Sequence, residues 1–133
     1  GVVVAICGGF QLLGRYYVNA SGERLNGISA IDVCTNGQFP NRLIGDVEIF
    51  NEEFGETYLG YENHIGRTYL GKNMKPLGKV VKGFGNNEED HAEGCHYKNV
   101  FCSYFHGPIL VRNQHLADRI IQTAAQRRHA KNA

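Results

Sequence analysis

Residues 1–14 read GVVVAICGGFQLLG, and this stretch decides the fold that the rest of the chain completes. The β-branched run at residues 1–6 is typical of a strand covered on both faces, which favours a central position in a parallel sheet. From Phe10 onward the apolar spacing becomes helical. A buried strand, a sharp turn at Cys7 and a helix therefore follow one another directly, which is the pattern of an α/β protein.

The remaining apolar runs predict more strands, separated by turns rich in Gly, Asn and acidic residues, and one closing helix. The expected strands cover residues 28–35, 42–50, 57–61, 78–84 and 100–105. In residues 42–50 the apolar and acidic positions alternate, which predicts one buried and one solvated face. The expected helix covers residues 115–128, with an apolar stripe from Leu116 to Ala125 and Asn113 as candidate N-cap.

The composition indicates one globular domain in a reducing compartment. The chain has 133 residues, 42% of them apolar and 20% charged, which suits a packed core and excludes a disordered segment. A net charge of +1 argues against a nucleic-acid partner, and no apolar run approaches the ~20 residues that cross a bilayer. The four widely spaced cysteines predict free thiols and a cytoplasmic location.

We interpret residues 1–133 as a single but partial domain. The sequence opens directly with the strand that looks central, although a doubly wound sheet normally builds neighbouring strands first. We therefore expect N-terminal strands of the domain to be missing from this sequence.

Cys7 is the strongest candidate for chemistry, because it stands between a buried strand and a helix N-terminus. This is the position of a nucleophile elbow, where a tight turn exposes the side chain. Backbone N–H groups and the helix dipole are expected to lower the pKa of the thiol and to hold an oxyanion. Gly8 and Gly9 are expected because a Cβ at either would crowd the turn. The competing interpretation is a core cysteine beside an ordinary strand-to-helix turn.

A thiolate that attacks a carbonyl carbon needs a base, and His106 is the best placed of the six histidines. It follows the predicted strand 100–105, and the next two residues, Gly and Pro, end that strand abruptly. Catalytic groups gather at the carboxyl ends of parallel strands, where Cys7 is also expected. His64 ends another predicted strand and is expected to line the same cleft. Taken alone, either histidine is more often structural.

Zinc is the alternative for one cluster, since four residues of metal-ligating type lie close together: Cys95, His96, Cys102 and His106. Zinc knuckles place their ligands in short pairs on turns, whereas Cys102 lies inside an apolar strand. We therefore expect no metal site.

The elbow residues 6–14, ICGGFQLLG, resemble the C-x-G-x-Q elbow of class I glutamine amidotransferases. Further segments narrow the resemblance to the glutaminase subunit of lipid II isoglutaminyl synthase, in the branch that also holds the cobyric acid synthases. They read GYENHIGRT at 60–68, KGFGNNEED at 82–90, EGCHYKN at 93–99 and HGPIL at 106–110. The resemblance covers residues 1–121, and several motifs in one order make it specific. It implies an α/β sandwich with a mostly parallel central sheet.

The resemblance also implies that the chain hydrolyses glutamine. Cys7 would attack the side-chain amide and form a glutamyl thioester, with His106 acting first as base and then as acid. The backbone N–H of Gly8 would stabilise the oxyanion.

The same resemblance implies a set of residues that bind glutamine. Gln11 matches the glutamine-binding position of the elbow. Arg42 would clamp the α-carboxylate, because a guanidinium can grip a carboxylate with two parallel hydrogen bonds. Asn63 and His64 complete the expected substrate-binding set.

One position departs from the wider class. Many class I amidotransferases carry a glutamate two residues after the histidine, where this sequence has Pro108. The resemblance implies that a Mur-ligase-like partner subunit lends an aspartate instead, in a heterodimer whose ammonia amidates the D-glutamate α-carboxylate of lipid II. ATP and Mg²⁺ are expected in that partner, and no cofactor is expected in this chain.

Two other functions stay open. The chain could be the amidotransferase part of a cobyric or cobyrinic acid synthase, which shares the elbow and a Gly-Tyr-Glu-x-His-x-Gly run. Asn63 and the Gly-Asn-Asn-Glu-Glu-Asp loop at 85–90 favour the cell-wall enzyme over that alternative. The chain could also be a non-catalytic scaffold of the same fold that binds its partner or glutamine.

Overall fold

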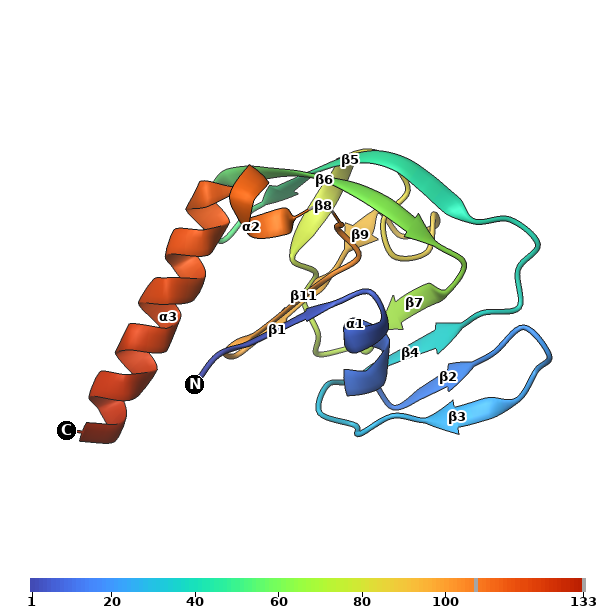
Figure 1. Cartoon of the computed structure of the whole chain (residues 1–133), viewed down its shortest axis with the longest axis horizontal. Coiled ribbons are helices and arrows are strands. Elements are labelled where there is room, and N and C mark those ends of the chain that lie inside the picture. The colour runs from blue at the N-terminus through green and yellow to red at the C-terminus, as the bar shows by residue number, and fades with distance from the viewer. Residues whose placement is uncertain (107, 133) are drawn as a thin grey trace.

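The computed structural model describes residues 1–106 and 108–132, apart from the side chains of residues 129–132. Strands and helices are mixed along the chain (Figure 1). The helices are α1 (Gly8–Leu13), α2 (Ile109–Arg112) and α3 (Gln114–Asn132). The strands are β1 (Val3–Ile6), β2 (Tyr16–Val18), β3 (Arg24–Asn26), β4 (Val33–Asn36), β5 (Leu43–Asn51), β6 (Glu56–His64), β7 (Arg67–Leu70), β8 (Gly78–Lys82), β9 (Ala92–Glu93), β10 (Cys95–Tyr97) and β11 (Val100–Ser103).

Within the described residues the strands form two mixed sheets, with orders β1-β11-β10 and β3-β2-β4-β7, and one antiparallel sheet, with order β6-β5-β8-β9. Only the β1–β11 and β2–β4 pairs are parallel among these strands, and the remaining pairs are antiparallel. The α/β class is confirmed, but the expected mostly parallel central sheet is not. The physical reason is that several strands are joined by short turns, which permit antiparallel pairing, whereas parallel strands need long crossovers.

The opening strand, turn and helix lie where the sequence predicts them. β1 pairs in parallel with β11, the strand that precedes His106, and Ile6 lies opposite Ser103. Figure 1 shows α1 directly after β1 and beside it. The carboxyl ends of β1 and β11 therefore share one edge of the first sheet.

The long hairpin of β5 and β6 supplies the other wall of the site. In β5 the side chains of Leu43, Val47 and Ile49 are buried while Asp46 is exposed, which confirms the predicted alternation. In β6 the inward positions include two charged or titratable residues, Glu62 and His64, both buried.

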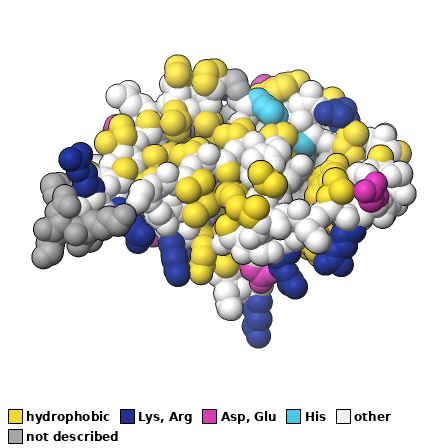
Figure 2. Space-filling view, turned by 60° about the horizontal axis from the view of Figure 1, so that its bottom comes forward, with side chains coloured by type: hydrophobic (Ala, Val, Ile, Leu, Met, Phe, Trp, Pro, Cys, Tyr) yellow, Lys and Arg dark blue, Asp and Glu magenta, His cyan; other side chains and the backbone are white. Residues whose placement is uncertain are grey.

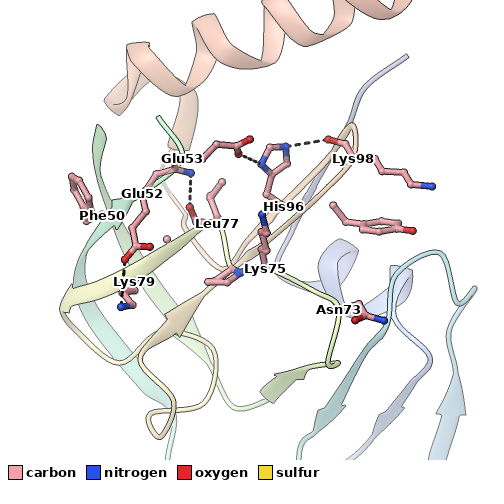
Figure 3. Close-up of a pocket in the computed structure, with 13 residues that line it drawn as sticks. Phe50, Glu52, Glu53, Asn73, Lys75, Leu77, Lys79, His96 and Lys98 are labelled. Carbon is pink, nitrogen blue, oxygen red and sulfur yellow. Dashed lines mark hydrogen bonds and ion pairs between the residues drawn. The ribbon is translucent and has the colours of Figure 1, made fainter. Parts of the chain in front are cut away.

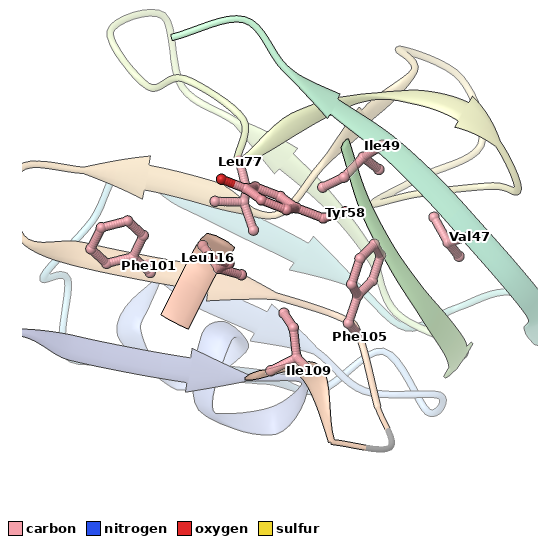
Figure 4. Close-up of a cluster of buried hydrophobic side chains, with 8 residues drawn as sticks. All are labelled: Val47, Ile49, Tyr58, Leu77, Phe101, Phe105, Ile109 and Leu116. Carbon is pink, nitrogen blue, oxygen red and sulfur yellow. The ribbon is translucent and has the colours of Figure 1, made fainter. Parts of the chain in front are cut away.

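Two apolar clusters hold these elements together. Figure 4 shows the first, in which side chains from β5, β6 and β11 meet Leu116 of α3 and Ile109 of α2. The second surrounds Phe10 of α1 and joins it to β4 and β11. Phe10 is completely buried, so its side chain holds α1, the helix that follows Cys7, against this second cluster.

The predicted strand 28–35 is shorter in the structure, because β4 begins only at Val33. The preceding backbone N–H groups of Ala30 and Ile31 donate to the carbonyl of Leu13, at 2.8 and 3.1 Å. Ser29 has a positive φ of 56° and donates its N–H to Gly14. This segment satisfies the free carbonyl groups at the end of α1 and so cannot continue the strand.

The closing helix is confirmed, but Asn113 does not cap it through its side chain. The amide of Asn113 donates to Leu59 and Ile109 carbonyls and accepts the N–H of Leu59, so it fastens α2 to β6. The predicted apolar stripe is buried at Leu116, whereas Ile121 is 65% exposed. Figure 1 shows the C-terminal half of α3 extending away from the sheets.

Candidate active site

Cys7 has the backbone of a strained elbow. It adopts φ 53° and ψ −106° between β1 and α1, a region that non-glycine residues rarely occupy. Its N–H donates to the Ser103 carbonyl at 2.9 Å, and its carbonyl accepts the N–H of Gln11 at 3.1 Å. The predicted strand–turn–helix geometry is confirmed, and the strain falls on the candidate nucleophile itself.

The expectation that a Cβ at Gly8 or Gly9 would crowd the turn is wrong. A Cβ built on Gly8 meets no atom within 4 Å, and one built on Gly9 makes only an ordinary contact with Ala5. Neither glycine has a positive φ. The turn therefore does not need glycine for steric reasons, and Gly8 leaves open space beside the half-buried thiol.

The pKa of the Cys7 thiol is raised, and not lowered as expected. Burial of the side chain dominates, because it removes a thiolate from water. The N–H of Gly8 and the charge of Arg42 act in the opposite direction without reversing the shift. A thiol in this state is protonated at rest and needs a base to become a nucleophile.

β1 and β11 end at the same edge of the first sheet, as predicted, and His106 follows three residues after the end of β11. Its N–H donates to the carbonyl of Tyr61 in β6 at 2.7 Å, and this bridge fixes the backbone that carries the imidazole. The side chain is half-buried. Residue 107, part of the predicted break after the strand, lies outside the described residues.

Arg42 and Asn63 form a polar pair beside this edge. Arg42 Nε donates to Asn63 Oδ1 at 2.8 Å, and the charge of Arg42 is felt by the Cys7 thiol. Asn63 is held in β6 opposite Ile44 of β5, one position from the register pair of Leu43 and His64. The exposed guanidinium keeps donors free to meet a carboxylate.

Gln11 and His64 are both engaged by Tyr104, which the sequence reasoning did not single out. Gln11 Nε2 donates to the Tyr104 hydroxyl at 3.1 Å, and that hydroxyl also shares a hydrogen bond with Thr68. The ring of His64 stacks on the Tyr104 ring with centroids 3.8 Å apart. Tyr104 thus joins the first turn of the elbow helix to the end of β6.

His64 lies beneath the site and not on its surface. It is 2% exposed, and burial lowers its pKa to about 4, so the imidazole is neutral. Nδ1 lies 2.8 Å from the Gly66 carbonyl, which can only accept, so this nitrogen carries the proton. Among the described buried side-chain atoms, His64 Nε2 and Glu62 Oε1 are those without a hydrogen-bond partner.

Two more buried charged residues surround the site and were also missed. Arg67 donates to the carbonyls of Asn41 and Ile65 at 2.7 and 2.6 Å, and so secures the backbone next to Arg42. Glu93 accepts the N–H of Tyr104, in the segment before His106, at 2.7 Å. Both residues fall within segments that carried the resemblance, but their sequence pattern alone does not reveal burial.

The cluster considered for zinc is dispersed over two strands. Cys95 and Cys102 face each other across β10 and β11 as buried free thiols. Burial raises the pKa of Cys95 to about 12 and that of Cys102 as well, which disfavours the thiolates that zinc requires. In the part of the chain that the structure describes, no group of three or more metal-ligating side chains is assembled.

A cavity of about 780 Å³ lies away from the elbow (Figure 3). It is lined on opposite sides by two ion pairs, Lys79 with Glu52 and His96 with Glu53, each at 3.3 Å. Cys7 and His106 do not line it. Its size therefore does not identify it as the place of the chemistry.

Cys7 at the elbow, His106 after the neighbouring strand end and Arg42 bonded to Asn63 are the residues that the resemblance to glutamine amidotransferases predicts for a cysteine-dependent site. The family model of the CobB/CobQ-like glutamine amidotransferase domain matches residues 1–114, and the chain belongs to this family.

Curated relatives make the comparison more specific. The chain is 59% identical, over 99% of its length, to the lipid II isoglutaminyl synthase (glutamine-hydrolyzing) subunit GatD of Streptococcus pneumoniae. It is 44% identical, over 94% of its length, to the protein of the same name from Staphylococcus aureus. A probable cobyric acid synthase of Methanothermobacter thermautotrophicus is 37% identical over 79% of the chain and is matched over 23% of its own length. The chain spans about half the length of the two GatD relatives, at 51% and 50%.

No helix within the described residues is both long and apolar enough to cross a membrane.

Proposed function

We propose that this chain is part of the glutaminase subunit of a lipid II isoglutaminyl synthase and that it releases ammonia from glutamine. The single observation that supports this proposal is the strained backbone of Cys7 at the sheet edge where β11, the strand before His106, also ends. The GatD relatives support the choice of this enzyme over a cobyric acid synthase, because their identity to the chain is higher.

The proposed reaction begins with a protonated thiol. The imidazole of His106 removes the proton from Cys7, and the thiolate attacks the carboxamide carbon of glutamine. The electron pair of the carbonyl moves to oxygen, and the N–H of Gly8 stabilises the resulting oxyanion. The tetrahedral intermediate collapses, its nitrogen takes the proton from His106, and ammonia leaves. Water then cleaves the glutamyl thioester and regenerates the thiol.

The proposed substrate site lies beside this pair. Arg42 grips the α-carboxylate of glutamine, oriented by its hydrogen bond to Asn63. Gln11, held by Tyr104, lies next to the carboxamide end, and His64 supports Tyr104 from below.

We also propose a partner and a wider architecture. Pro108 occupies the position of the usual orienting glutamate, so a Mur-ligase-like subunit would lend an aspartate and hold ATP and Mg²⁺.

Large apolar side chains such as Val3, Val4 and Val111 are exposed, and Figure 2 shows hydrophobic side chains gathered over one face. Such patches mark interaction surfaces. The β1–β11 pair would belong to a larger, mostly parallel sheet of a cytoplasmic, heterodimeric protein, of which residues 1–133 are a partial domain.

A non-catalytic scaffold is the less favoured function, because binding alone gives no reason to store backbone strain at Cys7. The test is Cys7→Ala in the full-length subunit assembled with its partner. We expect ammonia release from glutamine to be abolished. Cys34→Ala, which alters a half-buried free cysteine in β4, is the matched control and should retain activity. Equal ammonia release from Cys7→Ala and the wild type would end the proposal.

The acceptor is tested separately. The assembled enzyme is given glutamine, ATP and either lipid II or a corrin carboxylic acid. Amidation of lipid II is expected, and amidation of the corrin acid alone would assign the chain to the cobyric acid synthases instead.

A further inference from the structure

Glu93 is a fully buried acid that the proposed reaction does not use. It ends the short strand β9, and its exposed fraction is 0%. A carboxylate in the interior is costly unless donors surround it, so its partners indicate what it is for.

All the side-chain hydrogen bonds of Glu93 go to the segment that leads to His106. Its Oε1 accepts the backbone N–H of Tyr104 at 2.7 Å. The Ser103 hydroxyl donates to Oε1 at 3.1 Å and to Oε2 at 3.2 Å, and the same hydroxyl oxygen accepts the N–H of Phe105 at 2.9 Å. β11 ends at Ser103, so the backbone N–H groups of Tyr104 and Phe105 lie beyond the strand. They need acceptors outside the sheet ladder, and Glu93 and the Ser103 hydroxyl supply them.

Ser103 also holds the nucleophile. Its backbone carbonyl accepts the N–H of Cys7 at 2.9 Å, so one residue is fixed to the elbow on one side and to Glu93 on the other. The Glu93 carboxyl group is therefore linked through Tyr104 to the segment before His106 and through Ser103 to the turn at Cys7.

The strand that carries Glu93 is itself secured. Asn86 donates to the carbonyl of Gly94 at 3.1 Å and accepts its N–H at 2.8 Å, forming a two-bond clamp. Gly94 has a φ of +68°, and a Cβ there would overlap the carbonyl oxygen of Cys102. Glycine is required here because β9 and β10 turn against β11 with no room for a side chain.

We propose that Glu93 is a positioning residue of the glutaminase site, which acts through Ser103 and Tyr104 to set His106 against Cys7. This inference rests on the proposed function. Without the carboxylate, the Tyr104 N–H and the Ser103 hydroxyl lose their buried acceptor, and the turn before His106 must shift to find other partners. A displacement near 1 Å of a catalytic group can cost about 10²-fold in rate.

The test uses the full-length subunit with its partner and follows ammonia and glutamate release per folded molecule. Glu93→Ala should lower kcat about 10- to 100-fold, with the KM for glutamine within about 3-fold, because the proposed clamp on the α-carboxylate, Arg42 bonded to Asn63, does not depend on the hydrogen bonds of Glu93. Glu93→Gln keeps an oxygen that accepts the Tyr104 N–H and should retain most of the rate. Ser103→Ala, which keeps Glu93 but removes one link, should give an intermediate loss of kcat.

The matched control is Asn51→Ala. Asn51 is 3% exposed and bonds the backbone of Leu77 and Phe54 at 2.7 and 2.8 Å, at the closed end of the β5–β6 hairpin and five register positions from Tyr61, which bridges His106. It should lower stability and leave kcat unchanged, which separates positioning from general structural support.

The outcomes are distinguishable. Wild-type kcat in both Glu93→Ala and Ser103→Ala, or a rise in KM instead of a fall in kcat, would overturn the positioning role. If Glu93→Ala fails to fold, Ser103→Ala decides it, and a wild-type kcat in that variant overturns the positioning role. A wild-type complex that releases no ammonia, or one unaffected by Cys7→Ala, would instead overturn the proposed function.

Discussion

The backbone N–H of Cys7 and the carbonyl of Ser103 are joined by a hydrogen bond of 2.9 Å, which ties the turn of the candidate nucleophile to the strand that leads to His106. Cys7 and His106 are ninety-nine residues apart in the sequence, yet their backbones are linked by this single residue and its neighbours. Any change that moves Ser103 is therefore expected to alter both partners of the proposed reaction together.

Replacing His106 by Gln tests the base. Because burial raises the pKa of the Cys7 thiol, little thiolate forms at neutral pH without an imidazole to take the proton. We expect kcat to fall about 10²- to 10⁴-fold. The loss should shrink as the pH rises and the solution ionises the thiol. Steady-state ammonia release across pH measures both effects.

The control for this variant is His115→Gln, since His115 is exposed on α3 and pairs with Glu56 at 3.6 Å. Its kinetics should match the wild type. Near-normal turnover of His106→Gln at neutral pH would mean that another group activates Cys7.

Replacing Arg42 by Ala tests the clamp on glutamine. Losing charged hydrogen bonds worth about 1.5–3 kcal/mol should raise the KM for glutamine about 10- to 100-fold, with a smaller change in kcat. Arg42→Lys should recover only part of this, because an ammonium cannot make two parallel bonds. Arg24→Ala, which removes an exposed arginine stacked on Tyr16, is the control. An unchanged KM for Arg42→Ala would place the carboxylate elsewhere.

Replacing Tyr104 by Phe removes one hydroxyl from the centre of the site. Gln11 and Thr68 then lose a buried partner, and the free energy of unfolding should fall by about 1–3 kcal/mol. Denaturant unfolding of the full-length subunit measures this, with Tyr61→Phe as the control because Tyr61 is 40% exposed. Equal stability of the two variants would show that the hydroxyl network contributes nothing measurable.

Two buried acids should make stability fall with rising pH. Burial raises the pKa of Glu93 to about 8 and that of Glu62 to about 7, from 4.5 in an accessible chain. Their stabilising contribution is complete below 4.5 and is lost as the pH rises through the folded values. His64 has the opposite sign, since its pKa is lowered from 6.5 to about 4, so it contributes no further change above pH 6.5.

The measurement is the free energy of unfolding of the full-length subunit from pH 6.5 to values above the Glu93 pKa. The wild type should lose stability across this range. Glu62→Gln and Glu93→Gln should each flatten the curve, and Glu89→Gln, at an exposed loop position, should leave it unchanged. A wild-type curve that is flat or rising would contradict the prediction.

The sheet edge at which β1 and β11 end could be predicted from the sequence, because each strand end is marked by residues next to it in the chain. A β-branched run before Cys7 and an apolar run before His106 each mark a strand end, and parallel pairing then brings those ends together. The β5 alternation was predictable for the same reason, since period-two patterning needs only neighbouring residues.

What the sequence could not predict depends on distant partners. Glu93 and Tyr104 acquire their roles from contacts with β11 and with the elbow helix, and nothing adjacent to them in the chain signals this. Residues 28–32 have the composition of a strand but lose that structure to the carbonyl groups at the end of α1. The raised pKa of Cys7 likewise follows from tertiary burial, which outweighs the local helix terminus.

The two hydrogen bonds between Asn86 and Gly94 connect the loop between β8 and β9 to the position of Glu93. A substitution in that loop would displace β9 and, through Glu93, would change the turnover rate, although the substituted residue makes no contact with substrate. A substitution at Asn86 would then slow the proposed reaction from a loop that holds none of the residues proposed to bind glutamine.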